Sequence, residues 1–213
     1  MVIGFLHTAP EHTATFDQLI VQQGGLEAGR CHIVAPELLI EAMDRGIDDA
    51  DVRRRLVEAL GQFPAGIDRI VVTCSTLGGV AEALAPPDGP PVTRVDRPMA
   101  DAAIAVGGRI GVAYSISSTV VPTTALLWEV AEATGRHVDL DLIDCEDAWH
   151  HFIAGDRGSY VEQVADLIRR RAHDIDVVVL AQASMAPAVS LLDDLDIPVL
   201  ASPELAVSRA LSG

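Results

Sequence analysis

Cys74 is the residue of this sequence whose type and setting point most directly to chemistry. It follows the apolar segment 70–73 and precedes the segment 75–79, Ser-Thr-Leu-Gly-Gly, so we expect it at the turn between a buried strand and a helix. The positive end of a helix dipole lowers the pKa of a thiol, and a thiolate can act as a base or a nucleophile. The same setting also suits a small buried residue that ends a strand, since cysteine is among the most buried residue types.

Polar groups follow other apolar segments of the chain in the same way. Hydroxyl groups and the first N–H groups of helices together suit a small carboxylate. The candidate substrate-binding residues are His7, Thr8, Ser75, Thr76, Ser115, Ser118, Thr119, Gln182, Ala183 and Ser184. The imidazole of His7 also has a pKa suited to proton transfer, although a hydrogen-bonding role in a pocket is the simpler interpretation.

The elements that must position these residues come in two similar sets. Segments 3–8 and 110–115 match at an offset of 107 residues, and segments 67–74 and 175–182 match at an offset of 108. The Pro-Val pairs at 91 and 198 match again at 107. Three collinear matches at a nearly constant offset indicate an internal duplication.

Each half alternates short Val/Ile/Leu-rich segments with amphipathic ones, which is typical of an α/β fold with parallel sheets. In such sheets ligands bind beyond the carboxyl ends of the strands, where the candidate residues occur. The predicted strands are 2–7, 31–35, 68–73, 92–95, 109–114, 137–142, 176–180 and 198–201. The clearest predicted helices are 51–61, 98–106, 159–171 and 203–211.

Composition excludes several classes of function. The 213 residues are 49% hydrophobic, enough for a core, and carry a formal net charge of −16, which repels nucleic acids and anionic lipids. The three cysteines have no metal-binding spacing, and adjacent His150 and His151 cannot both hold one ion on a helix, so we expect no metal site. The longest uncharged segment, 110–128, is too rich in hydroxyls for a membrane span, and the N-terminus lacks the features of a signal peptide. We expect a cytoplasmic protein.

The segment 71–76, Val-Val-Thr-Cys-Ser-Thr, resembles the first cysteine motif of the aspartate/glutamate/hydantoin racemase superfamily. The segments 96–100 and 109–112 also resemble that family, as do Ser118-Thr119 and the internal duplication. The resemblance implies two pseudo-symmetric α/β halves that face each other across a cleft, with one cysteine from each half beside the α-carbon of a carboxylate substrate. It implies an enzyme that uses neither pyridoxal phosphate nor a metal.

The second cysteine motif departs from the family pattern. Segment 177–185 aligns with that motif, but Gln182 stands at the cysteine position. An amide neither accepts nor delivers a proton at ordinary pH, so the usual pair of bases is incomplete.

Three interpretations remain open. An isomerase could recruit His7 or Tyr114 as the second base. A decarboxylase or another lyase could use the single thiol of Cys74 for one-sided protonation; the arylmalonate decarboxylases of this superfamily also carry one cysteine, but in the second half. A non-catalytic protein could bind a small carboxylate through the hydroxyl groups.

The resemblance also sets the expected domain boundaries. The first half would comprise residues 1–95 plus 203–213, and the second would comprise 96–202, because in this family the terminal helix of each repeat packs on the other half. The expected partner is a small carboxylate substrate, without nucleic acid or membrane. Family members often dimerise, so a homodimer is compatible with the sequence.

Overall fold

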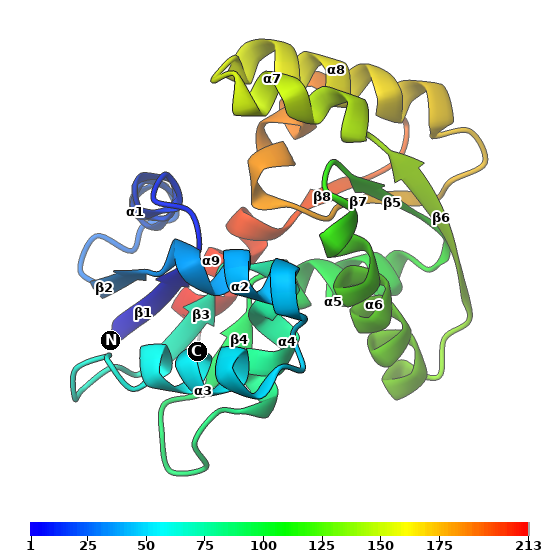
Figure 1. The fold of residues 1–213 in the computed structure, drawn as a ribbon. Helices are drawn as coiled ribbons and strands as arrows, with labels where there is room; N and C mark the ends of the chain where they lie inside the picture. The colour runs from blue at the N-terminus through cyan, green and yellow to red at the C-terminus, as the bar shows by residue number, and fades with distance from the viewer. Residues whose placement is uncertain (213) are drawn as a thin grey trace. The chain divides into compact units, whose positions relative to one another are not determined.

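The computed structural model describes residues 1–212 and divides into two compact units. Unit 1 comprises residues 1–95 together with the C-terminal helix from Pro203, and unit 2 comprises residues 96–202. Each unit has its own four-stranded sheet in which every pairing is parallel. Figure 1 shows these sheets with helices beside them. The predicted α/β class with two duplicated parallel sheets is confirmed.

Unit 1 has the strand order β2-β1-β3-β4, so that β1 and β3 occupy the centre of the sheet. Its strands are β1 (Val2–His7), β2 (Gly29–Val34), β3 (Arg69–Val72) and β4 (Val92–Arg94). Its helices are α1 (His12–Gln22), α2 (Pro36–Arg45), α3 (Ala50–Leu60), α4 (Ser75–Ala83) and α9 (Ser202–Ser212).

Unit 2 repeats this topology with the order β6-β5-β7-β8. Its strands are β5 (Gly108–Tyr114), β6 (Val138–Asp144), β7 (Val177–Leu180) and β8 (Val199–Ala201). Its α-helices are α5 (Arg97–Val106), α6 (Val120–Thr134), α7 (Trp149–Ile153) and α8 (Arg157–Arg171). Three 3-10 segments complete it: η1 (Ser117–Thr119), η2 (Glu146–Ala148) and η3 (Ala183–Leu191).

The duplication extends to individual hydrogen bonds. The carboxylate of Asp68, just before β3, accepts from the Val2 N–H at 2.6 Å, and that of Asp176, just before β7, accepts from the Arg109 N–H at 2.7 Å. These paired contacts join the start of the first strand to the start of the third in each unit. The first and third strands of the two sheets are therefore related at the offsets found in the sequence.

Two regions differ from the predicted pattern. Two helices, α2 and α3, connect β2 to β3 in unit 1, because Gly46 ends the first and the Asp49 carboxylate caps the second by accepting from the N–H groups of Asp51 and Val52. In unit 2, the segment after β7 is the 3-10 helix η3, which contains Pro187. Proline lacks the N–H that an α-helix interior requires, so an α-helix is disfavoured there.

The sheet of unit 1 buries both faces, as its apolar strands predict. Ile3 and Phe5 pack with residues of α1 and α9 on one face. Leu6 and Val72 pack with residues of α2, α3 and α4 on the other. Figure 1 shows the C-terminal helix α9 returning to this sheet from the far end of the chain. Alternation along each strand thus decides toward which helices a side chain points.

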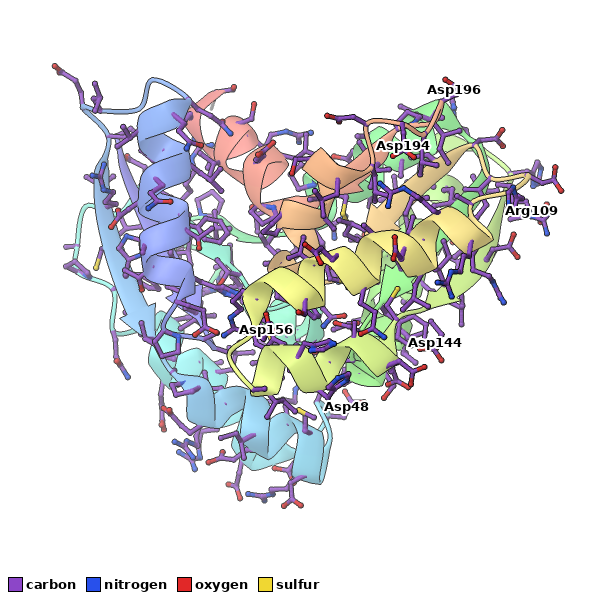
Figure 2. The ribbon with its side chains drawn as sticks, turned by 90° about the horizontal axis from the view of Figure 1, so that it is seen from above. Asp48, Arg109, Asp144, Asp156, Asp194 and Asp196 are labelled. Carbon is purple, nitrogen blue, oxygen red and sulfur yellow. The ribbon has the colours of Figure 1, made fainter. Side chains whose placement is uncertain are left out.

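The acidic excess of the chain is carried on exposed surfaces, where arginines pair with some of the carboxylates. Figure 2 shows Arg109, Asp194 and Asp196 on the outside of unit 2. Arg109 pairs with Asp141, and Asp194 pairs with Arg169 at 3.0 Å. Exposed pairs of this kind contribute little to stability. Within residues 1–212, no helix combines the length and apolar character that a membrane span requires.

The close approach of β4 to α4 depends on a glycine. A Cβ atom at Gly78 would lie 2.6 Å from the Cβ of buried Arg94. We expect Gly78→Ala to lower the free energy of unfolding by about 1–3 kcal/mol, because the overlap must push α4 and β4 apart. At Gly61, by contrast, an added Cβ would have its nearest neighbours at 3.5 Å, so Gly61→Ala is the matched control. Urea denaturation tests this, and equal stability of the two variants would contradict it.

Candidate active site

Cys74 lies where the sequence predicts, between a buried strand and a helix. β3 ends at Val72, Cys74 is the N-cap residue of α4, and its backbone is extended (φ −111°, ψ 112°). Its side chain is 6% exposed and belongs to the core that α2, α3 and α4 build on one face of the sheet. The Cys74 carbonyl accepts the Gly78 N–H at 2.8 Å, which completes the first turn of the helix.

The register between β1 and β3 places the other candidates of unit 1 at the same edge. Leu6 pairs with Val72, and the Thr73 N–H donates to the Leu6 carbonyl at 2.9 Å. Thr8 therefore leaves β1 beside the point where Cys74 leaves β3. Ser75 and Thr76 are the first two residues of α4, and each is 7% exposed. The first N–H groups of a helix have no acceptors within the helix, so this edge is rich in donors.

His7 is the last residue of β1, and its side chain takes part in a hydrogen-bonded chain on the opposite face from Cys74. Its Nδ1 lies 2.8 Å from the Thr73 hydroxyl, and its Nε2 lies 2.9 Å from Nδ1 of His32 on β2. Nε2 of His32 lies 3.3 Å from the carboxylate of Asp17 on α1, which pairs with Arg30 at 2.6 Å. Both ring nitrogens of His7 are thus engaged within unit 1.

Burial also makes His7 a poor base. Its side chain is fully buried, and burial, reinforced by the nearby His32 and His12, lowers its pKa from 6.5 to about 3. A neutral ring suits the hydrogen-bonded chain, because it offers one N–H donor and one acceptor nitrogen to the Thr73 hydroxyl and to His32. This arrangement favours the structural interpretation of His7 over a second catalytic base.

In unit 2, Gln182 occupies the place that Cys74 has in unit 1. It is the N-cap residue of η3, with β7 ending two residues before it. Its side-chain oxygen accepts the N–H of Ser115 at 2.7 Å and that of Ile116 at 3.1 Å, and its side-chain nitrogen donates to the Ser115 hydroxyl at 3.0 Å. The carboxamide therefore closes the end of β5 with three hydrogen bonds.

The network extends from Gln182 to a tyrosine that the sequence analysis missed. The Ser115 hydroxyl lies 2.7 Å from the phenol oxygen of Tyr160 on α8, which lies 3.1 Å from the Ser184 hydroxyl. Tyr160 is fully buried, and burial raises its pKa. The only signal in the sequence was the position of Tyr160 on the apolar side of the helix predicted at 159–171. Ser115, Gln182 and Ser184 thus form a structural network within unit 2.

The remaining candidates lie near the same end of β5 and β7. Ser118 and Thr119 belong to η1, where the Thr119 hydroxyl donates to the Ile116 carbonyl at 2.8 Å, and Ala183 is the first residue of η3. The carboxyl edge of each sheet therefore gathers the candidates of its own unit.

Tyr114, the other candidate for a second base, is the last residue of β5. Burial, followed by the Asp144 carboxylate, raises the pKa of Tyr114, which makes its phenol a weaker acid.

The other two cysteines lie in settings unlike that of Cys74. Cys31 is within β2. Cys145 is fully buried just after β6, and burial, followed by the Asp144 carboxylate, raises its pKa to about 12. A neutral thiol at this position has the structural role expected of a buried cysteine.

Arg94, at the end of β4, also escaped the sequence analysis. It is 4% exposed, and its guanidinium donates to the Ser75 carbonyl at 3.4 Å. The Glu82 carboxylate of α4 accepts the Arg94 N–H at 2.9 Å. Gly78 and Gly79 make room for this side chain, because an added Cβ would lie 2.6 Å from the Arg94 Cβ at Gly78 and 3.1 Å from an Arg94 guanidinium nitrogen at Gly79. A buried cation therefore lies against the helix that Cys74 caps.

Neither a protein-family model nor a curated protein sequence matches the chain. Solved structures do match over nearly its whole length. Glutamate racemase RacE1 from Bacillus anthracis has a TM-score of 0.72 at 23% identity, covering 99% of this chain and 80% of its own. The aspartate racemase of Picrophilus torridus has a TM-score of 0.73 at 16% identity, and the match covers 99% of this chain and 93% of that protein. An allantoin racemase from Klebsiella pneumoniae has a TM-score of 0.64 at 20% identity, and the match covers 100% of this chain and 86% of that protein.

This chain has the fold of the glutamate and aspartate racemases. The resemblance drawn from its motifs is thereby confirmed at the level of the fold. Each unit carries one copy of the duplicated racemase-type sheet, with Cys74 after the third strand of the first and Gln182 after the third strand of the second.

The low pKa of His7 predicts how stability depends on pH. Below about pH 6.5 the unfolded chain takes up a proton at His7 that the folded protein excludes until about pH 3. The contribution of His7 to the free energy of unfolding should therefore be fully present above pH 6.5 and should be lost as the pH decreases toward 3. Between these values its slope approaches about 1.4 kcal/mol per pH unit. Denaturant titrations between pH 7 and 4 should give a shallower dependence for His7→Gln. Identical pH dependences for the two proteins would contradict this.

The hydrogen bonds of the Gln182 side chain predict that a substitution which removes them destabilises the protein through unit 2. Gln182→Met keeps the side-chain length but leaves the N–H groups of Ser115 and Ile116 without their acceptor. We expect a loss of about 1–3 kcal/mol in the free energy of unfolding. Ser190→Ala, at an exposed position of the same 3-10 segment, is the control and should be nearly neutral. Thermal and chemical denaturation measure the difference, and a neutral Gln182→Met would show that these bonds contribute nothing.

Proposed function

We propose that this protein is a cofactor-independent, racemase-like enzyme that moves a proton at the carbon next to a carboxylate, with Cys74 as its single acid/base group. The observation that carries the proposal is that the two equivalent positions after the third strands, Cys74 and Gln182, hold side chains of different chemistry. The N-cap residue after the third strand is a thiol in unit 1 and a hydrogen-bonded carboxamide in unit 2. Because the solved structures with this fold include glutamate and aspartate racemases, we take the thiol, which is the titratable group of the two, as the proton carrier.

The mechanism needs only one face of the substrate carbon. The Cys74 thiolate removes the α-proton, the C–H electron pair moves into the carboxylate to form an enediolate, and the thiol returns a proton to the same face. This half-reaction exchanges the proton without converting the substrate, so net turnover with a single thiol requires an enediolate that is formed by cleavage of another bond. In the decarboxylase alternative, loss of carbon dioxide from a substituted malonate leaves the same enediolate, which the Cys74 thiol protonates. Donors at the edge of unit 1, including the hydroxyls of Ser75 and Thr76, would stabilise the developing negative charge.

Gln182, His7 and Tyr114 make unsuitable second bases. Gln182 has no titratable group, both ring nitrogens of His7 are engaged, and the pKa of Tyr114 is raised. We therefore favour one-sided proton transfer over two-base racemisation.

The amino-acid composition supports the absence of pyridoxal phosphate from this chemistry. All 15 basic residues counted as lysine or arginine are arginines, so the sequence contains no lysine. Pyridoxal phosphate enzymes hold their cofactor through a lysine Schiff base. This chain therefore offers no lysine for that Schiff base.

The decisive experiment is α-proton exchange in D2O, followed by NMR. The panel contains both enantiomers of small amino acids and hydroxy acids, hydantoins, and monosubstituted malonates, for which release of carbon dioxide is also measured. We expect Cys74→Ala to lower the rate on the active substrate by at least about 100-fold, the scale of lost acid/base catalysis. Cys31→Ala and Cys145→Ala remove the other thiols one at a time and should keep the activity of the folded protein.

The outcomes separate the proposal from its alternatives. Activity that survives in Cys74→Ala would contradict the role of the thiol. If panel members bind without exchange or decarboxylation, the protein is a carboxylate-binding protein and the proposed enzymatic function is wrong.

A further inference from the structure

The guanidinium of Arg94 lies at the first turn of α4, the helix that Cys74 caps. Arg94 is 4% exposed, and it donates to the carbonyl of Ser75, the residue directly after Cys74. Its side chain passes Gly78 and Gly79, which leave the space that it fills. Burial of a charged group is costly, and the N-terminal end of a helix is itself positive. A cation in this place is favourable only when negative charge is close to it.

The equivalent place in unit 2 holds no cation. In unit 1, Arg94 pairs with Val72 in the register between the third and fourth strands. In unit 2, Ala201 pairs with Leu180 in the same register. Val72 and Leu180 each lie two residues before the position that carries the thiol or the carboxamide. Ala201 is therefore the equivalent of Arg94, and a methyl group stands where unit 1 has a guanidinium.

The glycines that make room for Arg94 also have no counterpart in unit 2. Gly78 and Gly79 follow the thiol by four and five residues. At the same spacing after the carboxamide stand Ala186 and Pro187. The arginine, its two glycines and the thiol thus occur together in unit 1, and other residues replace all four in unit 2. Because unit 2 forms the same sheet without this cation, we connect the cation with the thiol rather than with the sheet.

The surroundings of Cys74 explain why its ionised form needs a cation. Cys74 is buried in a core that includes Leu6, Leu38 and Leu77. Burial of this kind raises the pKa of a thiol, as it does for Cys145. A positive charge and the first N–H groups of a helix act in the opposite direction, because both stabilise an anion.

We propose that Arg94 is a positioning residue that keeps Cys74 in its thiolate form. The glycines and the Ser75 carbonyl hold the guanidinium at the first turn of α4. The anionic form of the N-cap side chain is the form that this charge and the helix dipole both stabilise. Arginine stays protonated throughout the range in which a thiol titrates, so the charge is constant. Arg94 acts on the proposed proton transfer only through Cys74.

Carboxylates near this core oppose the effect of Arg94. The Glu82 carboxylate accepts the Arg94 N–H at 2.9 Å, and Asp96, two residues after Arg94, is fully buried. On the other helices of the same core, carboxylates of α2 pair with an arginine of α3, namely Glu37 and Glu41 with Arg55. Removal of Arg94 would leave the negative charges in place, so it can only disfavour the thiolate.

The test is the pH dependence of the reaction of Cys74 with iodoacetamide, followed on the full chain by mass spectrometry of the peptide that contains Cys74. The thiolate is the reactive form, so the rate follows its fraction. We expect a wild-type midpoint below about pH 8.5, the ordinary pKa of a thiol. Arg94→Met has no charge and should raise the midpoint by about one pH unit, so the rate near pH 7 falls about tenfold and recovers at alkaline pH. Arg94→Lys should return the midpoint toward the wild-type value.

Arg45→Met is the matched control, because it removes one positive charge from an exposed arginine of unit 1 that pairs with Asp49 and Asp51. Its midpoint should equal that of the wild type. Arg94→Gln is a second uncharged variant, which can still donate to the Ser75 carbonyl and should behave as Arg94→Met does. The same midpoint in wild type and in either uncharged Arg94 variant would overturn the proposal, and so would an equal rise in Arg45→Met. A wild-type midpoint at or above about pH 8.5 would overturn it even if neither Arg94 variant folds.

The part of Arg94 in catalysis rests on the proposed function, whereas its effect on the thiol is measured without a substrate. If the midpoint rises in Arg94→Met but no panel member reacts, the cation acts on the thiol and the enzymatic proposal is wrong. If α-proton exchange depends on Cys74 while Arg94→Met has the wild-type midpoint, the enzymatic proposal stands and this inference is wrong.

Discussion

The register between the first and third strands of each sheet is the constraint on which the candidate site depends. In parallel sheets, neighbouring strands end at the same edge, so a fixed register decides which residues meet there. Pairing of Leu6 with Val72 brings Thr8 next to Cys74, and pairing of Ala113 with Leu180 brings Ser115 next to Gln182. A slip by one residue would turn Cys74 to the other face and bury Thr73 among α2, α3 and α4.

The two units use this shared edge in different ways. In unit 2, buried polar groups satisfy each other from Ile116 through Gln182 and Ser115 to Tyr160, which stabilises a fixed arrangement. In unit 1, the polar chain of His7, His32 and Asp17 lies on one face of the sheet while the thiol lies on the other. The position after the third strand thus carries a hydrogen-bonded carboxamide in unit 2 and a thiol at the start of a helix in unit 1.

Much of this fold could be predicted from the sequence because its signals are local. Apolar segments identified all eight strands to within two residues at either end, and the turn at Cys74 followed from a strand directly before a Ser-Thr helix start. The internal repeat indicated that the two halves share one architecture, whereas the order of the strands within each sheet was not predicted. The alternation of strands and helices predicts an α-helix after the third strand of the second half, but Pro187 favours the 3-10 helix η3 there.

The side-chain networks could not be predicted in the same way. His32 shows no local pattern that distinguishes it from any half-buried strand residue, and its contact with His7 exists only because β2 lies beside β1. Tyr160 reaches Ser115 across 45 residues, and Gln182 reaches it across 67. The sequence identified Gln182 as a missing cysteine, whereas its bonds to the end of β5 required the folded unit.

The stereochemical course of exchange tests the central claim of a single acid/base group most directly. One enantiomer of the active substrate is incubated in D2O with the protein, and the same sample is followed by NMR for the α-proton and by circular dichroism for optical activity. One-sided transfer by Cys74 predicts that the α-proton signal disappears while the circular dichroism signal stays constant. Decay of the circular dichroism signal at the rate of exchange would show that a second base acts on the opposite face, and it would contradict this account.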